Sequence, residues 1–159
     1  MSEIYQIIWT AAATICGGVL VFVTSQVIQE YILSPLKKYK NTIAEIDNKL
    51  KFYANIIFLP INIENTIPEK RERYLYCSKV LRKLSCDLET SYKTIPDCIR
   101  EKFCNSDSNI ATAAASLIGL SNSLFENYLS SSLKEYNKKE LRKIRELLNI
   151  RMLKEKGEE

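Results

Sequence analysis

A single long apolar run opens the chain and dominates its hydrophobic pattern. No charged residue occurs from Ile4 to Gln29. At about 1.5 Å per residue, a helix over these residues would be roughly 39 Å long, which exceeds the roughly 30 Å hydrocarbon core of a bilayer. Tyr5 and Trp9 lie at its start, where aromatic side chains favour the level of the lipid headgroups. The pattern predicts one N-terminal transmembrane helix, which we assign to residues 1–35.

The charges on either side of the run predict its orientation. Lys37, Lys38 and Lys40 follow it, whereas Glu3 and the amino terminus precede it. By the positive-inside rule, the C-terminal side should face the cytoplasm. A cleaved signal peptide fits less well, because no Lys or Arg stands before the run and the run is longer than a signal peptide's apolar region. The same length disfavours a buried helix of a soluble domain.

Small and polar residues within the run recur at steps of three and four, which places them on one face of a helix. Two interpretations of this stripe are open. It packs against other helices in a homo-oligomer, because small and hydroxyl residues let helices approach closely. Alternatively, it lines a water-filled pore made by several copies. We favour packing, and a pore would also require the oligomer. The stripe consists of Gln6, Thr10, Thr14, Gly17, Val21 and Thr24.

The rest of the chain repeats its apolar positions with the period of a helix, and no segment alternates with the period of a strand. A heptad stripe runs from Leu36 to Ile57. We favour one face of a bundle helix for this stripe over a coiled-coil stalk. Pro35 is expected to bend or restart the chain at the membrane surface, and Pro60 to end this helix.

Capping signals divide the chain after Pro60 into further helices. Thr66 and Thr94 are each followed by Ile, Pro and an acidic residue, so each is expected to be an N-cap. The helix after Thr94 should be short, with Ile99 and Phe103 facing inward. Ser106 is expected to cap an Ala-rich helix, and a last helix comes after it. The fold class is therefore all-α: one transmembrane helix, a cytoplasmic bundle of four or five helices over residues 36–156, and a frayed end at residues 157–159.

The absence of histidine restricts the chemistry more than any motif does. It removes Ser-His-Asp and Cys-His nucleophile systems, histidine metal sites and histidine general bases. The five cysteines include no C-x-x-C pair, so they are expected to be reduced thiols, neither zinc ligands nor disulfides. We predict that the protein is not an enzyme and that it has no cofactor and no metal site.

Two groups of Lys and Arg stand out in a chain of net charge +4, one from Lys70 to Lys83 and one from Lys138 to Arg151. They are candidates for contact with RNA phosphates or with anionic lipid headgroups. A solvated helix face with Glu partners three or four residues away is the interpretation that we favour for most of them. The strongest candidates for RNA or lipid contact are Arg142, Lys143, Arg145 and Arg151.

The whole chain resembles the small membrane accessory proteins of type VI-B CRISPR loci. The resemblance is architectural: a short chain, one N-terminal membrane helix, and a compact bundle that ends in an Arg-rich helix. The segment from Leu117 to Leu124 looks like a packing motif of that family. The resemblance implies a divergent HEPN-like bundle, a bacterial inner-membrane location and work beside an RNA-guided RNase system.

The HEPN ribonuclease pattern is an Arg followed a few residues later by a His. Arg142 and Arg145 are best placed for the Arg, and Asn149 stands where the His would be. An amide cannot take up a proton as imidazole does, so a HEPN-like domain here should be catalytically inactive. The family then implies a homo-oligomeric membrane pore or membrane-perturbing protein of antiviral defence. The alternative is a membrane-tethered adaptor or sensor that binds RNA or a protein partner through the basic domain.

Overall fold

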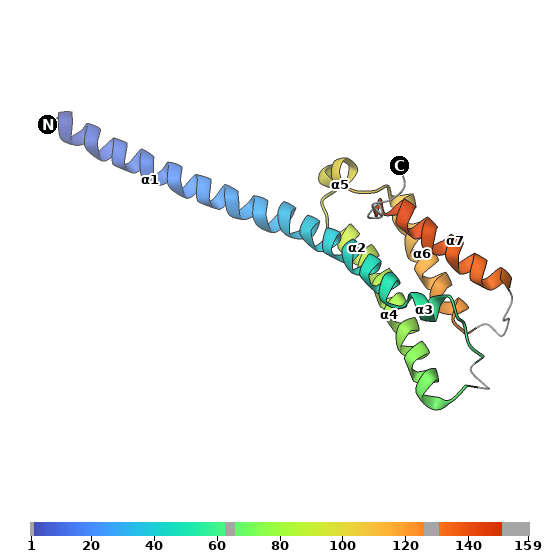
Figure 1. Ribbon diagram of the computed structural model, residues 1–159. Coiled ribbons are helices and arrows are strands. Elements are labelled where there is room, and N and C mark those ends of the chain that lie inside the picture. The colour runs from blue at the N-terminus through green and yellow to red at the C-terminus, as the bar shows by residue number, and fades with distance from the viewer. Residues whose placement is uncertain (1, 63–65, 126–130, 151–159) are drawn as a thin grey trace, which may run out of the picture.

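The computed structural model describes residues 2–62, 66–125 and 131–150, and the elements in these ranges are helices. The prediction of an all-α fold is thereby confirmed. Figure 1 shows two parts, a long N-terminal rod and a bundle gathered around the far end of that rod. The rod consists of α1 (Ser2–Ile28), the π-helical turn η1 (Gln29–Leu33) and α2 (Ser34–Phe52), which form one continuous helix.

The expectation that Pro35 restarts the chain at the membrane surface is wrong. The helix passes through Pro35 because the turn before it widens to π geometry, in which the backbone N–H of Ser34 donates to the carbonyl of Gln29, five residues back. Proline lacks an N–H and its ring crowds the carbonyl four residues earlier. A wider turn relieves that crowding without interrupting the helix. The rod therefore reaches about 75 Å over the 50 residues from Glu3 to Phe52.

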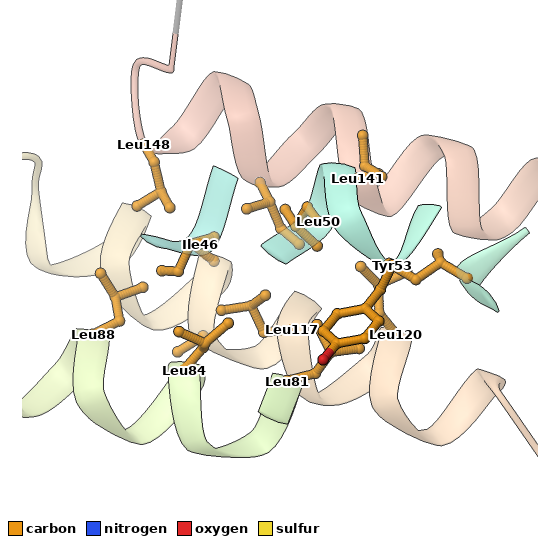
Figure 2. Packing of buried hydrophobic residues seen from close by; sticks show 14 of the residues in the cluster. Ile46, Leu50, Tyr53, Leu81, Leu84, Leu88, Leu117, Leu120, Leu141 and Leu148 are labelled. Carbon is orange, nitrogen blue, oxygen red and sulfur yellow. The ribbon is translucent and has the colours of Figure 1, made fainter. Parts of the chain in front are cut away.

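The bundle is built from α2 and the helices after it, which are α3 (Ala54–Ile57), α4 (Pro68–Lys93), α5 (Asp97–Phe103), α6 (Asp107–Ser123) and α7 (Ser131–Leu147). Its core is one cluster of buried side chains to which α2, α4, α6 and α7 all contribute (Figure 2). The helix α4 lies between α2 and α6, and α7 packs on α6.

The heptad stripe lies in this core, as the bundle-face interpretation predicted. Its buried members are Tyr39, Ile46, Leu50, Tyr53 and Ile57. Since the chain's own helices cover this face, it is not free to form a coiled-coil stalk between copies. The expected end of the helix at Pro60 is wrong: the backbone leaves α-helical geometry at Tyr53, and the short α3 comes next.

The capping predictions had mixed outcomes. Ser106 caps α6, because its hydroxyl accepts a hydrogen bond of 3.3 Å from the backbone N–H of Asn109. Thr66 and Thr94 do not cap the helices after them, whose N-cap residues are Ile67 and Pro96. Each Thr hydroxyl instead donates backward, Thr94 to the carbonyl of Ser91 at 2.8 Å, and Thr66 to that of Asn62.

The predicted packing motif, Leu117 to Leu124, holds α6 between its two neighbours. The hydroxyls of Ser121 and of Ser78 on α4 lie 2.7 Å apart within the core. On the other side of α6, a Cβ added to Gly119 would lie 3.0 Å from the hydroxyl oxygen of Tyr136 on α7. Small residues at these positions allow close helix approach, so the segment has a structural role in this fold.

Candidate membrane helix and basic surface

The side chains of α1 are exposed along its whole described length. Trp9 is 74% exposed, Leu20 67% and Phe22 63%. In the stretch with mean hydropathy 2.0, none of the residues is buried, and this is the one helix among the described residues that is long and apolar enough to cross a membrane. Apolar surface of this extent is unfavourable in water, so lipid or other chains must cover it.

The predicted stripe lies on the exposed α1, and two of its hydroxyls bond to backbone carbonyls of the same helix. Thr10 donates to the carbonyl of Gln6 and Thr14 to that of Thr10, each at 2.8 Å. Thr hydroxyls commonly bond to the carbonyl four residues back in this way. These two donors therefore need no water to be satisfied in an apolar surrounding. What the stripe offers a neighbour is a small-residue face, with no atom within 4 Å of a Cβ built at Gly17.

Arg145, a candidate RNA or lipid contact, faces α2 in the structure. Its Nε lies 3.6 Å from Oδ1 of Asp47, and the two side chains are only 19% and 17% exposed. The other carboxylate oxygen of Asp47 pairs with Lys51 at 2.6 Å. Arg145 thus joins α7 to α2 inside the bundle. Sequence reasoning did not find Asp47 as its partner, because no local pattern signals a pairing between segments so far apart in the chain.

The other α7 candidates differ in accessibility. Arg142 is exposed, as are Lys138 and Lys139 one turn before it, whereas Lys143 is half-buried. Arg151 lies outside the described residues. The exposed basic face of α7 therefore centres on Arg142.

Asn149, the predicted vestigial HEPN position, ends the last helix. Its φ of 53° lies in the left-handed region, which Asn tolerates better than most residues. The N–H of Asn149 donates to the carbonyl of Glu146 at 3.1 Å, and that of Ile150 to Arg145 at 2.9 Å. These two bonds form a Schellman motif. Arg142, Arg145 and Asn149 do line one surface groove, but two of the three have structural roles there.

The first basic group also contains a structural member. Nε of Arg82 donates to the hydroxyl of Ser121 at 3.1 Å, and its Nη2 donates to Oδ1 of Asn122 at 2.5 Å. Arg82 therefore fastens α4 to α6. Arg82 is itself exposed, as are the other members of the group: Lys70, Arg71, Arg73, Lys79 and Lys83.

A polar junction that sequence reasoning missed joins four parts of the bundle just after α5. The hydroxyl of Tyr39 donates to Oδ1 of Asn105 at 3.2 Å, and the hydroxyl of Tyr92 lies 3.0 Å from the Asn105 carbonyl and 2.5 Å from Oδ1 of Asp107. The amide of Asn105 donates to the carbonyl of Leu147 at the end of α7. Only contacts distant in sequence create this junction, so no local motif announces it.

The ionisable groups of the bundle core are poor candidates for catalysis. Burial raises the pKa of Tyr39 to about 12. The pKa of Tyr92 is also raised, chiefly by burial and then by its hydrogen bond to Asp107. Burial raises the pKa of the Cys77 thiol to about 12, which leaves it unreactive at neutral pH. These groups stay protonated at neutral pH and hold structure.

In the part of the chain that the structure describes, no group of three Cys, Asp or Glu side chains is placed to hold a metal ion. The likeness to the type VI-B accessory proteins remains a prediction from the sequence. Comparison of the chain with protein family models, with characterised proteins and with solved structures finds no match.

Proposed function

We propose that this chain is a single-pass protein of the bacterial inner membrane, with its bundle in the cytoplasm. Copies assemble through α1 into a homo-oligomer that forms a pore or otherwise perturbs the membrane in CRISPR-linked antiviral defence. The protein acts without enzymatic chemistry, beside an RNA-guided RNase system. The observation that carries the proposal is the exposure of α1, in whose most apolar stretch no residue is buried by the chain itself.

The position of the aromatic residues supports a spanning helix. From Trp9 to Tyr31 the rod rises about 33 Å, close to the roughly 30 Å of a hydrocarbon core. Both side chains are exposed, at 74% and 64%. A cleaved signal peptide would end before the folded domain. Here the helix instead continues unbroken into α2, whose Tyr39 is already part of the core.

Assembly through α1 is supported by the character of its stripe. Lipid chains offer no hydrophobic drive between helices, so helices in a membrane associate through close packing and hydrogen bonds. Gly17 and the Thr residues provide a face on which a second helix can approach closely. The bonds within the helix satisfy the donors of Thr10 and Thr14 but leave lone pairs on their oxygens as acceptors. The same face therefore serves a dry helix contact or, in a larger ring, a wet pore lining.

Oligomerisation has a matched test in the two neighbouring glycines. Neither Gly17 nor Gly18 has an atom within 4 Å of an added Cβ, so substitution disturbs nothing within one chain. The two positions lie about 100° apart around the helix, and only Gly17 is on the stripe. Gly17→Leu should reduce the mass of the detergent-solubilised assembly towards the monomer, whereas Gly18→Leu should leave it unchanged. A wild-type protein that is monomeric would refute assembly.

Pore formation is tested by conductance across a bilayer containing the purified full chain. We expect the triple variant Thr10→Leu, Thr14→Leu and Thr24→Leu to lose the conductance of the wild type. The control replaces Ala12, Val19 and Val23 with Leu on the opposite face of α1, and should keep it. Unchanged conductance in the stripe variant, or none in the wild type, would refute the pore.

A second function is favoured by the exposed basic face of α7. Lys138, Lys139 and Arg142 lie together on its outer side, which suits a membrane-tethered adaptor or sensor that binds RNA or a protein partner. Full-length protein in detergent that binds single-stranded RNA with steep salt dependence, weakened by Arg142→Glu, would support this function. RNA binding together with absent conductance would make it the better account of the protein.

A further inference from the structure

We infer that α5 rests on the membrane surface and that the side chain of Phe103 reaches the lipid headgroups from just outside their layer. This inference rests on the anchoring of α1 in the membrane, but on neither pore formation nor oligomerisation. It concerns how the bundle is oriented once the anchor is inserted. The partner is the lipid surface itself, and α5 would be a second contact with it.

The location of α5 brings it next to the bilayer. Figure 1 shows α5 at the end of the bundle from which α1 projects. The junction just after α5 fixes this level, since Asn105 accepts a hydrogen bond from Tyr39. Tyr39 follows Tyr31 by eight residues, or about 12 Å along the helix. With Tyr31 at the edge of the hydrocarbon core, the level of Tyr39 lies about 4–7 Å outside the headgroups, because these add about 5–8 Å on each side of the core. At that distance a side chain of α5 can still reach the headgroups.

Phe103 is exposed at this end of the bundle, contrary to the prediction that it faces inward. Ile99, one turn earlier on the same helix face, packs against the core. Phe103 is the last residue of α5 and is 64% exposed. The bundle ends before it can cover this ring. An aromatic side chain left exposed just outside the headgroups can be covered by the interfacial layer, where such rings are favoured.

The charges around Phe103 suit an anionic lipid surface. Lys102 beside it is exposed, and so are Lys37, Lys38 and Lys40 on the adjoining part of the rod. These four cations outnumber the two exposed acids of α5, Asp97 and Glu101, and Asp97 is paired with Arg100. Basic residues next to an apolar side chain are typical of segments that lie in the interface.

The bundle holds α5 firmly in this position. Arg100 pairs with Asp97 at 2.5 Å and lies 3.8 Å from Asp107. Its guanidinium carbon also sits 5.1 Å from the centre of the Tyr92 ring. Since α5 is tied to α4 and α6 in this way, the depth of Phe103 should be fixed by the depth of the rod.

The test measures the contact of single tryptophans with lipid. Trp9 is the only tryptophan of the chain, so the double variant Trp9→Phe, Phe103→Trp carries one reporter at α5. The matched control is Trp9→Phe, Phe52→Trp, because Phe52 is also exposed, at 74%, but follows Tyr39 by 13 residues, about 20 Å further from the membrane. Each protein is reconstituted into phosphatidylcholine and phosphatidylglycerol vesicles with and without brominated phosphatidylcholine, which quenches tryptophan on contact. Circular dichroism verifies the fold of both variants.

We expect brominated lipid to quench the tryptophan at position 103 clearly, though less than Trp9 of the wild type, and to leave the fluorescence of the one at position 52 unchanged. Quenching of Trp9 without quenching at position 103 would overturn the inference while the anchor stands. Equal quenching at positions 103 and 52 would also overturn it, because the bundle would then lie on its side or bind lipid nonspecifically. An unquenched Trp9 would refute the anchor and, with it, this inference.

Discussion

The helices α1 and α6 are both rich in small and apolar residues, but the structure uses them in opposite ways. In α6, Ala113, Leu117 and Leu120 are fully buried between neighbouring helices. In α1, Leu20 is 67% exposed. The glycines differ likewise, because Gly119 faces the Tyr136 hydroxyl across a tight contact and Gly17 faces open space. The small residues of α6 thus have their partners in the same chain, whereas those of α1 must find theirs outside it.

Polar groups on the two helices show the same contrast. The hydroxyl of Ser85 on α4 crosses to α6 and donates to the carbonyl of Ala114 at 3.0 Å. The hydroxyl of Thr14 turns back to its own helix. A hydrogen bond between helices adds specificity to their packing. A hydrogen bond within one helix only lowers the cost of burying its hydroxyl in an apolar surrounding. The helices of the bundle therefore cover one another's side chains, whereas the apolar side chains of α1 stay exposed in the structure.

The largest expected difference between the two regions is in the free energy of unfolding of the bundle. Leu117→Ala removes fully buried methyl groups and should cost about 2–5 kcal/mol. Leu20→Ala on α1 should change it by less than about 0.5 kcal/mol. Denaturant titration of both variants in detergent, followed by circular dichroism, gives the comparison. A large effect of Leu20→Ala would mean that α1 packs on the bundle, which would contradict the separation of the two regions.

A smaller effect is expected at the ion pair between α7 and α2. Arg145→Gln leaves Asp47 with Lys51 alone in a mostly buried site, so we expect a loss of about 1–2 kcal/mol, between the values for exposed and fully buried pairs. Arg142→Gln, one turn earlier on the exposed face, is the matched control and should cost less than about 0.5 kcal/mol. Equal losses would show that the Asp47 contact does not stabilise the bundle.

The sequence predicts the parts of this molecule that depend on short-range patterns. Helical periodicity locates the all-α bundle, and the Ser106 cap is found because nothing competes for its hydroxyl. Thr94 has the same pattern, yet its hydroxyl bonds back to Ser91 at the end of α4, a competing acceptor that a capping rule does not consider. Pro35 stays within the helix because a single π turn accommodates it.

The candidate site is less predictable from the sequence, because the role of each residue depends on contacts with segments far away in the chain. Arg142 and Arg145 look equivalent in the sequence, and the position of Asp47 on α2 separates the exposed Arg142 from the half-buried Arg145. The sequence predicts that Phe103 faces the core, but in the structure it lies at the end of the bundle and is exposed. The α1 stripe is readable from the sequence, but no described part of the chain covers it, so the structure does not assign it a partner.

Alkaline pH should destabilise the bundle, because ionisable side chains are buried in its core and none of them belongs to α1. Tyr39 and Cys77 have folded-state pKa values raised to about 12, above the ordinary values of 10.0 and 9.0. Their contribution is complete below pH 9 and is lost as the pH rises towards 12, because the unfolded chain releases these protons first. Between its ordinary pKa and its folded-state pKa, each group lowers the free energy of unfolding by about 1.4 kcal/mol per pH unit. Denaturant titrations across this range should show the fall, and Cys77→Ala should reduce its slope between pH 9 and 10.

The smallest expected effect separates two interpretations of Asn149. As a left-handed cap after α7, it should tolerate Gly, which adopts positive φ freely, whereas Asn149→Ala should lose about 1 kcal/mol of the bundle's unfolding free energy. As a displaced catalytic position, it should regain ribonuclease activity in Asn149→His. We expect no cleavage of RNA by that variant, because residue 149 lies beyond the last turn of α7 and Arg145 is committed to Asp47. Cleavage that depends on Arg142 would instead show that the groove retains a ribonuclease geometry, and the protein would then have to be treated as a degenerate enzyme.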